Sequence, residues 1–380
     1  MKKQYGFTLV ELTVGMAVTL IVLAATVLAF RDATNANQHV TMSEDVTDNL
    51  RAGLNLIEQD LIQAGSGIPT GGIPIPSFAA SAACPNGTSN INRPVLTGTT
   101  TFPVCNLYLS AVEPGNGMGP LIASPDATST TNSDIITMLY QDNTTTSGTY
   151  LVGMDAAPIN GGTCNGTISS TGKTVQFDSA CFDLSKLSAN GTQINPGDLI
   201  LFSNNNGNAL QSVSSVSGQT LTFSSGDAFG LNGQATATGG TIVQTQNYNT
   251  NPVTGAKIFN LGTYPPTTAT RIWMISYYLD NVADPNHVQL IRRVNFNAGQ
   301  PVGETLESLQ FTFNFNDGKT ANQPAVPNGF SENLIRSVNI YLGARSTNKY
   351  SQNRKYIREN FQSQVTLRSM AYFNQFPEGQ

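Results

Sequence analysis

Charged residues are scarce in this chain, at 11% of 380 residues, whereas roughly a quarter is typical of soluble proteins. Gly, Ser, Thr and Asn are abundant instead, which favours an all-β extracytoplasmic head with long polar loops. No basic run follows Lys2 and Lys3, so the charge pattern of a nucleic-acid-binding protein is missing and no nucleic-acid partner is predicted. The net charge of −5 becomes −7 without these two lysines (17 basic against 24 acidic side chains), and this diffuse negative charge indicates no particular partner.

Histidine is nearly absent as well, and His39 and His287 leave few places for a Ser-His-Asp arrangement. The chain has no Gly-x-Ser-x-Gly, phosphate-loop or His-Glu-x-x-His motif. Oxygen ligands for calcium occur around Asp134 and Asp142 and in the loop 204–208, but neither group has the register of a calcium-binding loop, so polar turns are the preferred interpretation. The sequence therefore predicts no enzymatic activity, no cofactor and no metal site.

What the chain does contain is an apolar run of 24 residues from Phe7 to Phe30, in which Glu11 is the only charged residue. A helix of that length spans roughly 36 Å, which is enough for a bilayer core of about 30 Å. A carboxylate inside such a segment costs on the order of 2.5–3.5 kcal/mol, so Glu11 is a candidate functional residue. A secretory signal peptide is one alternative, but its apolar region is shorter, and a plain membrane anchor would have no use for Glu11.

The run Gly6-Phe7-Thr8-Leu9-Val10-Glu11, followed by an apolar helix, resembles the class III signal of type IV pilins and type II secretion pseudopilins. The resemblance implies that a prepilin peptidase cuts between Gly6 and Phe7 on the cytoplasmic side and N-methylates Phe7. It also implies that Glu11 pairs with the N-terminal amine of a neighbouring subunit, because opposite charges in low dielectric relieve each other's burial cost. Lys2 and Lys3 agree with a cytoplasmic leader.

The helix is expected to continue beyond the membrane, from Phe7 to near Ala64. Gly65-Ser66-Gly67 and then Pro69 are signals that end a helix. No proline interrupts the mature helix, a departure from many major pilins that points towards a minor pilin or pseudopilin. Apolar residues recur every three or four positions in its second half, which predicts one apolar stripe packed on a β head, formed by Val46, Leu50, Leu54, Ile57 and Leu61.

Short strands are expected after residue 132, and longer strands in the C-terminal third. Segments 271–279 and 288–296 flank a polar turn and predict a hairpin. The longer strands are expected to form one antiparallel sheet against the amphipathic half of the helix. All expected strands are 134–140, 174–177, 198–202, 209–213, 219–223, 241–244, 271–279, 288–296, 306–315, 337–342 and 364–372.

These elements predict an α+β fold, in which a long N-terminal helix packs on an antiparallel β-sheet head with a largely β inserted region. The order of the elements resembles the PilW-type minor pilins, with loose echoes at 55–61, 289–293, 306–311 and 365–368. The predicted segments are a leader (1–6), a transmembrane and filament-core helix (7–30), the amphipathic half of the same helix (31–66), the inserted region (67–260) and a C-terminal antiparallel sheet (261–380).

Four cysteines follow the apolar run, on the side of the membrane where the compartment is oxidising. No Cys-x-x-Cys pair occurs, which disfavours a zinc site. The spacing suggests two local disulfides, Cys84–Cys105 and Cys164–Cys181, although four cysteines allow three connectivities.

The resemblance implies a structural, non-enzymatic subunit: a minor pilin that primes, caps or supports assembly of a type IV pilus. The alternatives are a J-type pseudopilin of type II secretion, and a tip adhesin or binding protein, for which the bulky head is suited. The expected partners are a prepilin peptidase, other minor pilins, the major pilin and inner-membrane lipid. The chain is expected in the bacterial inner membrane with a periplasmic head, and later in the pilus at the cell surface.

Overall fold

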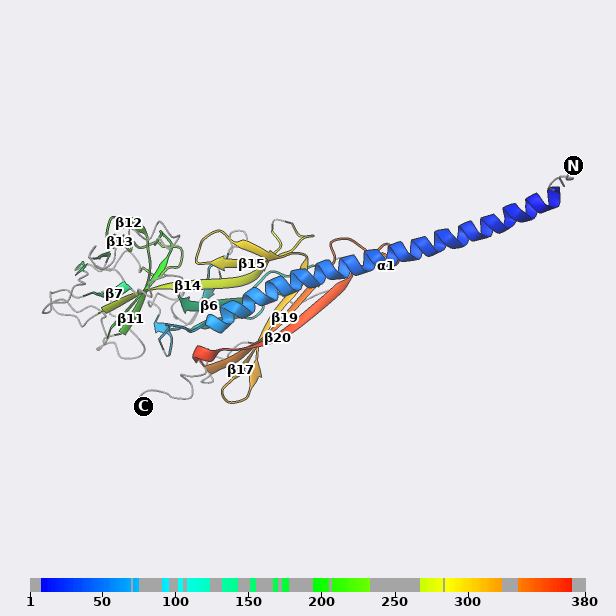
Figure 1. Ribbon diagram of the computed structural model, residues 1–380. Coiled ribbons are helices and arrows are strands. Elements are labelled where there is room, and N and C mark those ends of the chain that lie inside the picture. Colours follow the sequence, from blue (N-terminus) through cyan, green and yellow to red (C-terminus); the bar gives the residue numbers. More distant parts are fainter. Residues whose placement is uncertain are drawn as a thin grey trace.

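The computed structural model describes residues 8–69, 71–74, 91–95, 102–104, 108–123, 132–142, 151–154, 167–169, 173–177, 194–204, 207–232, 267–282, 284–322 and 334–370. One long helix, α1 (Leu9–Gln63), packs its C-terminal half on a head of antiparallel sheets. Its N-terminal half extends away from the head as a bare rod (Figure 1). The predicted α+β fold, with a long helix on antiparallel sheets, is thereby confirmed.

The apolar stripe explains why α1 joins the head only in its second half. Val46, Leu50, Ile57 and Leu61 are buried, and Leu54 packs against the same core, so the predicted stripe is confirmed. The helix ends at Gln63 with Ala64 as its C-cap residue, and Gly65 follows with a φ of 85°, a conformation that glycine adopts without steric cost.

The larger of the two sheets that contact α1, called the large sheet, has its strands in the order β11-β10-β14-β15-β16. β6 and β7 also pair with β14, and β5 pairs with β6. The strands are β5 (Val112–Gly115), β6 (Ile135–Gln141), β7 (Leu151–Met154), β10 (Leu199–Asn204), β11 (Gly207–Ser212), β14 (Thr267–Asp280), β15 (Gln289–Val294) and β16 (Gln300–Gly303).

The predicted hairpin is present as β14 and β15, with Leu279 opposite Leu290, but it does not belong to the sheet expected for the C-terminal third. β14 is 14 residues long and pairs with β10 over its first part and with β6 and β15 over the rest. The expectation of one C-terminal sheet was therefore wrong, because β14 has strands of the inserted region as neighbours. The predicted boundary at 260/261 lies outside the described residues and stays a prediction.

The second sheet on α1, called the C-terminal sheet, has the order β18-β17-β19-β20. Its strands are β17 (Leu306–Phe315), β18 (Thr320–Ala321), β19 (Ile335–Arg345) and β20 (Arg358–Thr366). In β17 the alternation predicted from the sequence is confirmed, because Leu309, Phe311, Phe313 and Phe315 are buried and the residues between them are half-buried. α1 packs against β19 and β20 of this sheet and against β16 of the large sheet, so it contacts both.

The last strand lies earlier than the predicted 364–372. β20 begins at Arg358 and ends at Thr366, and it pairs with β19 from Arg345↔Arg358 to Ser337↔Thr366. Its outward residues are polar and only Val365 is buried, so the sequence pattern lacks the apolar alternation that would mark a strand. Pairing with the long β19 decides the start of β20.

A smaller part of the head is built on a core of its own. β10 is buried on both faces: Leu199 and Leu201 join the main core, whereas Ile200 and Phe202 join a second core with Leu221 and others. That second core is covered by a sheet of β8 (Thr167–Ile168), β9 (Thr174–Gln176), β12 (Ser215–Ser217) and β13 (Thr220–Thr222). Two further pairs are β1 (Ile73–Pro74) with β4 (Tyr108–Leu109), and β2 (Ile91–Asn92) with β3 (Pro103–Val104). The predicted strand 241–244 lies outside the described residues.

At Gly53, α1 packs closely against the head. This glycine is buried in the helix, and a Cβ added there would lie 2.7 Å from Leu290 Cδ2 and 3.6 Å from Leu342 Cδ2. We expect Gly53→Leu to lower the free energy of unfolding by about 1–3 kcal/mol, the usual cost of overpacking a core. Urea unfolding of the full chain in detergent measures this, with exposed Ala52→Leu as the matched control. Equal stability of the two variants would contradict close packing at Gly53.

Candidate processing and assembly site

The N-terminal end of α1 is a capping box formed by Thr8 and Glu11. The Glu11 carboxylate accepts hydrogen bonds from Thr8 N (3.0 Å) and Thr8 Oγ1 (2.9 Å), and Glu11 N donates to Thr8 Oγ1 (3.3 Å). The carboxylate of Glu11, the fifth residue after the predicted cut, is thus held at the start of the helix. Gly6 and Phe7 lie outside the described residues, so the predicted cleavage and methylation stay predictions.

The half of α1 that precedes the head is apolar and exposed along its whole length. Leu9 is 80% exposed, Leu20 65% and Phe30 75%, and the helix is long and apolar enough to cross a membrane. The hydroxyls of Thr13, Thr19 and Thr26 donate to carbonyl oxygens three or four residues earlier, at 2.8–2.9 Å. These polar groups are satisfied inside the helix, as an apolar environment requires. An exposed apolar surface of this size is typical of a site that contacts lipid or other proteins.

The other end of α1 is attached to the large sheet by a buried carboxylate, Asp60. It accepts hydrogen bonds from Tyr140 Oη (2.8 Å), Tyr277 Oη (2.7 Å) and Arg292 Nε and Nη2 (2.8 and 3.2 Å). Burial, and then the negative charge of Asp60, raises the pKa of both tyrosines, so the phenols stay protonated and donate. The four side chains come from α1, β6, β14 and β15 and form one network.

Sequence reasoning missed the Asp60 network, although a signal was present. Asp60 lies three residues after Ile57 and next to Leu61, on the apolar face of an amphipathic helix. A charged residue in that position has to find a partner when the face is buried, since an unpaired buried charge is very costly. The sequence does not say which residues supply the partner.

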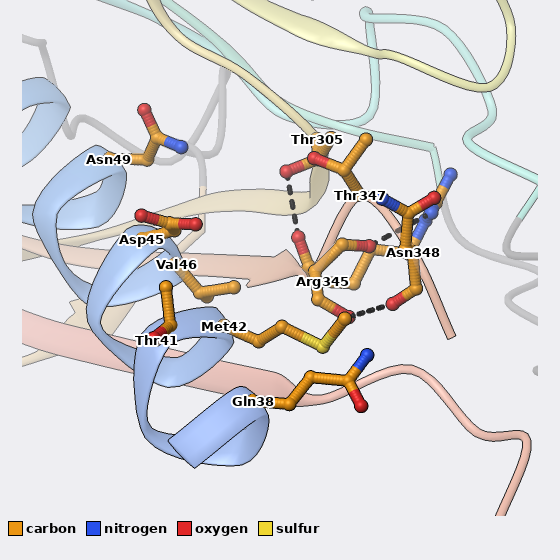
Figure 2. A pocket seen from close by; sticks show the side chains of 11 residues that line it. Gln38, Thr41, Met42, Asp45, Val46, Asn49, Thr305, Arg345, Thr347 and Asn348 are labelled. Carbon is orange, nitrogen blue, oxygen red and sulfur yellow. Dashed lines mark hydrogen bonds between the residues drawn. The ribbon is translucent and has the colours of Figure 1, made fainter. Parts of the chain in front are cut away.

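Where α1 leaves the head, a groove of about 500 Å³ opens between the helix and the segment after β19. Figure 2 shows Gln38, Met42 and Asp45 of the helix facing Arg345 and Asn348 across it. Polar and apolar side chains are mixed along its walls, and Asp45 and Arg345 are the two ionisable residues among the described residues that line it.

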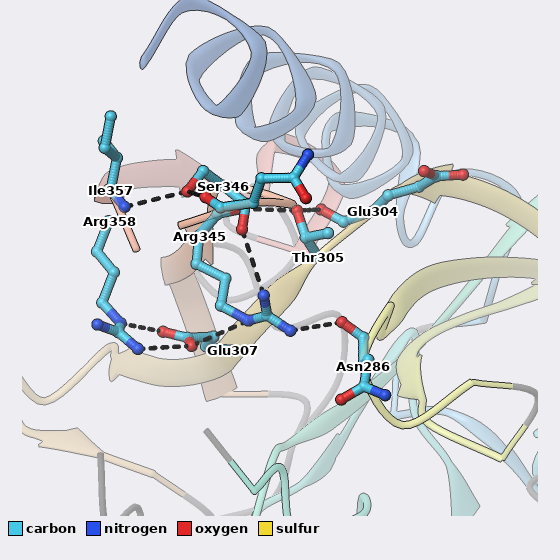
Figure 3. Close-up of polar contacts among 9 residues, drawn as sticks. Asn286, Glu304, Thr305, Glu307, Arg345, Ser346, Ile357 and Arg358 are labelled. Carbon is cyan, nitrogen blue, oxygen red and sulfur yellow. Dashed lines mark hydrogen bonds and ion pairs between the residues drawn. The ribbon is translucent and has the colours of Figure 1, made fainter. Parts of the chain in front are cut away.

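The segment that borders this groove is a loop, 346–357, whose two ends are joined through Glu307. Arg358 donates to Glu307 through Nε (2.7 Å) and Nη2 (3.2 Å), and Arg345 Nε lies 3.4 Å from the same carboxylate (Figure 3). Ser346 N donates to Ile357 O at 2.7 Å, which closes the base of the loop. The loop is thus a continuation of the β19–β20 hairpin.

The two aspartates considered as calcium ligands, Asp134 and Asp142, have protein partners, whereas residues 205 and 206 of the loop 204–208 lie outside the described residues. Asp134 accepts from Gly117 N (2.7 Å) and Phe311 N (2.8 Å) and so joins a turn to β17. Burial raises the pKa of Asp134, and the two backbone hydrogen bonds, which lower this pKa, offset only part of the effect. Asp142 lies 3.6 Å from Arg271 Nη1. Among the described residues no group of three His, Cys, Asp or Glu side chains is placed to hold a metal ion.

Residues 1–27 match the prokaryotic N-terminal methylation motif. No curated protein and no solved structure gave a match. The matched segment contains Gly6, Phe7, Glu11 and most of the exposed apolar run, so the resemblance of the N-terminus to the pilin signal is confirmed. The chain therefore carries the N-terminal methylation motif, and this motif, on a long helix packed on antiparallel sheets, supports a likeness to type IV pilins and pseudopilins.

Proposed function

We propose that the chain is a minor pilin, a non-enzymatic subunit that primes, caps or supports the assembly of a type IV pilus. The observation that carries the proposal is an exposed apolar helix within the methylation motif, with Glu11 as its one charge between residues 7 and 30. Such a helix is stable in lipid before assembly and among the helices of other subunits afterwards. The proposed partners are therefore inner-membrane lipid, a prepilin peptidase, other minor pilins and the major pilin.

The head is proposed to lie in the periplasm, and at the cell surface once the subunit is in a pilus. Lys2 and Lys3 support this orientation, because basic residues beside a spanning segment stay in the cytoplasm. The disulfides Cys84–Cys105 and Cys164–Cys181 are proposed for the same oxidising compartment. All four cysteines lie outside the described residues, so both disulfides stay predictions.

Processing provides the first test. Co-expression with a prepilin peptidase is expected to yield a chain that begins at methylated Phe7, because the resemblance to the pilin signal makes Gly6 the last leader residue, and the matched motif includes Gly6. N-terminal sequencing and intact mass measure the product, and Gly6→Leu, which places a bulky side chain at the cut, should remain uncut as the control. An intact Met1, or a cut near Ala24-Ala25 as in a secretory signal, would refute the proposal.

An in-frame deletion of the gene tests whether the chain is a minor pilin, a pseudopilin or a tip adhesin. Loss of pili with normal protein secretion is expected for a minor pilin. Loss of secretion with normal pili would instead assign the chain to the pseudopilins. Normal pili that no longer adhere would support the tip adhesin.

A further inference from the structure

The loop between β19 and β20 gathers positive charge in a chain that is negative overall. Residues 349–358 contain four basic side chains and no acidic one, whereas the whole chain carries a net charge of −5. Arg358 is bound to Glu307. Lys349, Arg354 and Lys355 are exposed, and Arg354 and Lys355 form no ion pair with the residues that the structure describes. We call the loop 346–357, which carries these three side chains, the basic loop.

The basic loop is held in place against α1. The ring of Tyr350 is buried and lies edge-on to that of His39, with 5.2 Å between the centroids. The Ser351 hydroxyl donates to Gln38 Oε1 at 2.6 Å and lies 3.3 Å from Asn35 Oδ1. Tyr350 N donates to Lys355 O, and Arg354 N donates to Tyr350 O. The charges therefore keep a defined position along the helix.

That position is beside the end of the apolar run. The loop follows the helix towards its N-terminus, and in Figure 1 it lies where the helix leaves the head. Asn35 and Gln38 are five and eight residues beyond Phe30, which corresponds to about 7–12 Å along a helix. The headgroup layer on each side of a bilayer is about 5–7 Å thick. Lysine and arginine side chains can reach across the few remaining ångströms to the phosphates.

We propose that the basic loop binds anionic phospholipid headgroups of the outer leaflet of the inner membrane, and so holds the head on the bilayer before assembly. The inference rests on the proposed membrane anchoring of residues 7–30. Charge complementarity favours anionic lipid as the partner of the basic loop. The neighbouring charges of the helix, Arg31 and Asp32, offset each other and so leave the positive charge of the loop uncompensated. Extraction into a filament then has to break these contacts.

The experiment uses the full chain in vesicles of phosphatidylcholine, with or without phosphatidylglycerol as about one third of the lipid. A fluorescent amino acid replaces exposed Gln352, at the tip of the loop, or Ala33, on the helix, and headgroup-bound spin labels quench probes that approach the phosphates. We expect quenching of the Gln352 probe in the anionic vesicles only, and its loss at 1 M salt, where the Debye length is about 3 Å. The Ala33 probe should be quenched in every case.

Charge removal provides the matched comparison. Each basic side chain near an anionic surface contributes about fivefold, so Arg354→Gln with Lys355→Gln should lower the ratio of docked to free heads about 25-fold. Lys173→Gln with Lys319→Gln removes the same charge from exposed sites elsewhere on the head and should leave the ratio unchanged.

Three outcomes would overturn the inference. Quenching at Ala33 without quenching at Gln352 would reject lipid binding by the loop and leave the membrane anchor intact. No quenching at either position would reject the anchor, and the inference with it. Unchanged quenching of the Arg354 and Lys355 variant, combined with fewer pili, would assign the basic loop to a neighbouring protein subunit.

Discussion

Asp60→Ala is expected to destabilise the head by about 3 kcal/mol, the lower end of the range for removing one partner of a buried ion pair. Asp60 is 5% exposed and accepts four hydrogen bonds, so its removal leaves Arg292 without its anion and Tyr140 and Tyr277 without their acceptor. Restoring hydration to these groups would require opening the contact between α1 and the large sheet. The loss is therefore larger than for an ordinary surface charge.

Urea unfolding of the full chain in detergent measures this loss. Trp273, the one tryptophan of the chain, lies in β14 near the network and reports unfolding of the large sheet by its fluorescence. Asp48→Ala is the matched control, because its side chain is on the same helix and 80% exposed. A change below about 1 kcal/mol for Asp60→Ala, no more than an exposed pair contributes, would contradict the view that the network holds the helix on the sheet.

Glu11→Ala is expected to leave membrane insertion and processing largely intact and to lower pilus assembly on the order of 100-fold, the equivalent of about 3 kcal/mol. The substitution makes the helix more apolar and leaves Gly6 in place. The proposed pairing partner, the amine at the N-terminus of a neighbouring subunit, would be buried in the membrane without a counter-charge. Counting pili and immunoblotting the sheared fraction measure assembly.

The capping role of Glu11 can be separated from its charge. Glutamine is the other residue that completes a capping box with threonine, so Glu11→Gln is expected to keep the helix start at Thr8. It should nevertheless impair assembly as strongly as Glu11→Ala if the charge is what matters. Glu44→Ala, which removes an exposed carboxylate beyond the apolar run, is the control. Normal piliation with Glu11→Ala, in a strain where deleting the gene abolishes pili, would reject an essential pairing of Glu11. That result would still be compatible with a position of the subunit at the tip of the pilus.

The sequence by itself determined the pilin-type N-terminus, the length of α1 and the faces of the regular elements. The signal around Gly6 and Glu11 is read from consecutive residues, and the matched motif covers the same segment. The stripe from Val46 to Leu61 and the alternation in β17 are local periodicities, because a helix buries every third or fourth residue and a strand every second one. These features depend on neighbouring residues along the chain and are independent of how the rest of the head is arranged.

The tertiary structure decided which elements became partners. The β14–β15 hairpin was predicted, but its place in the large sheet follows from pairing with β6 and β10, strands more than 60 residues away. The network of Asp60 joins residues up to 232 positions apart, and the start of β20 depends on β19 across the basic loop. Periodicity states which face of an element is apolar but not what will cover it. That choice is made by burial of the whole core and by the requirement that each buried charge and strand edge finds a partner.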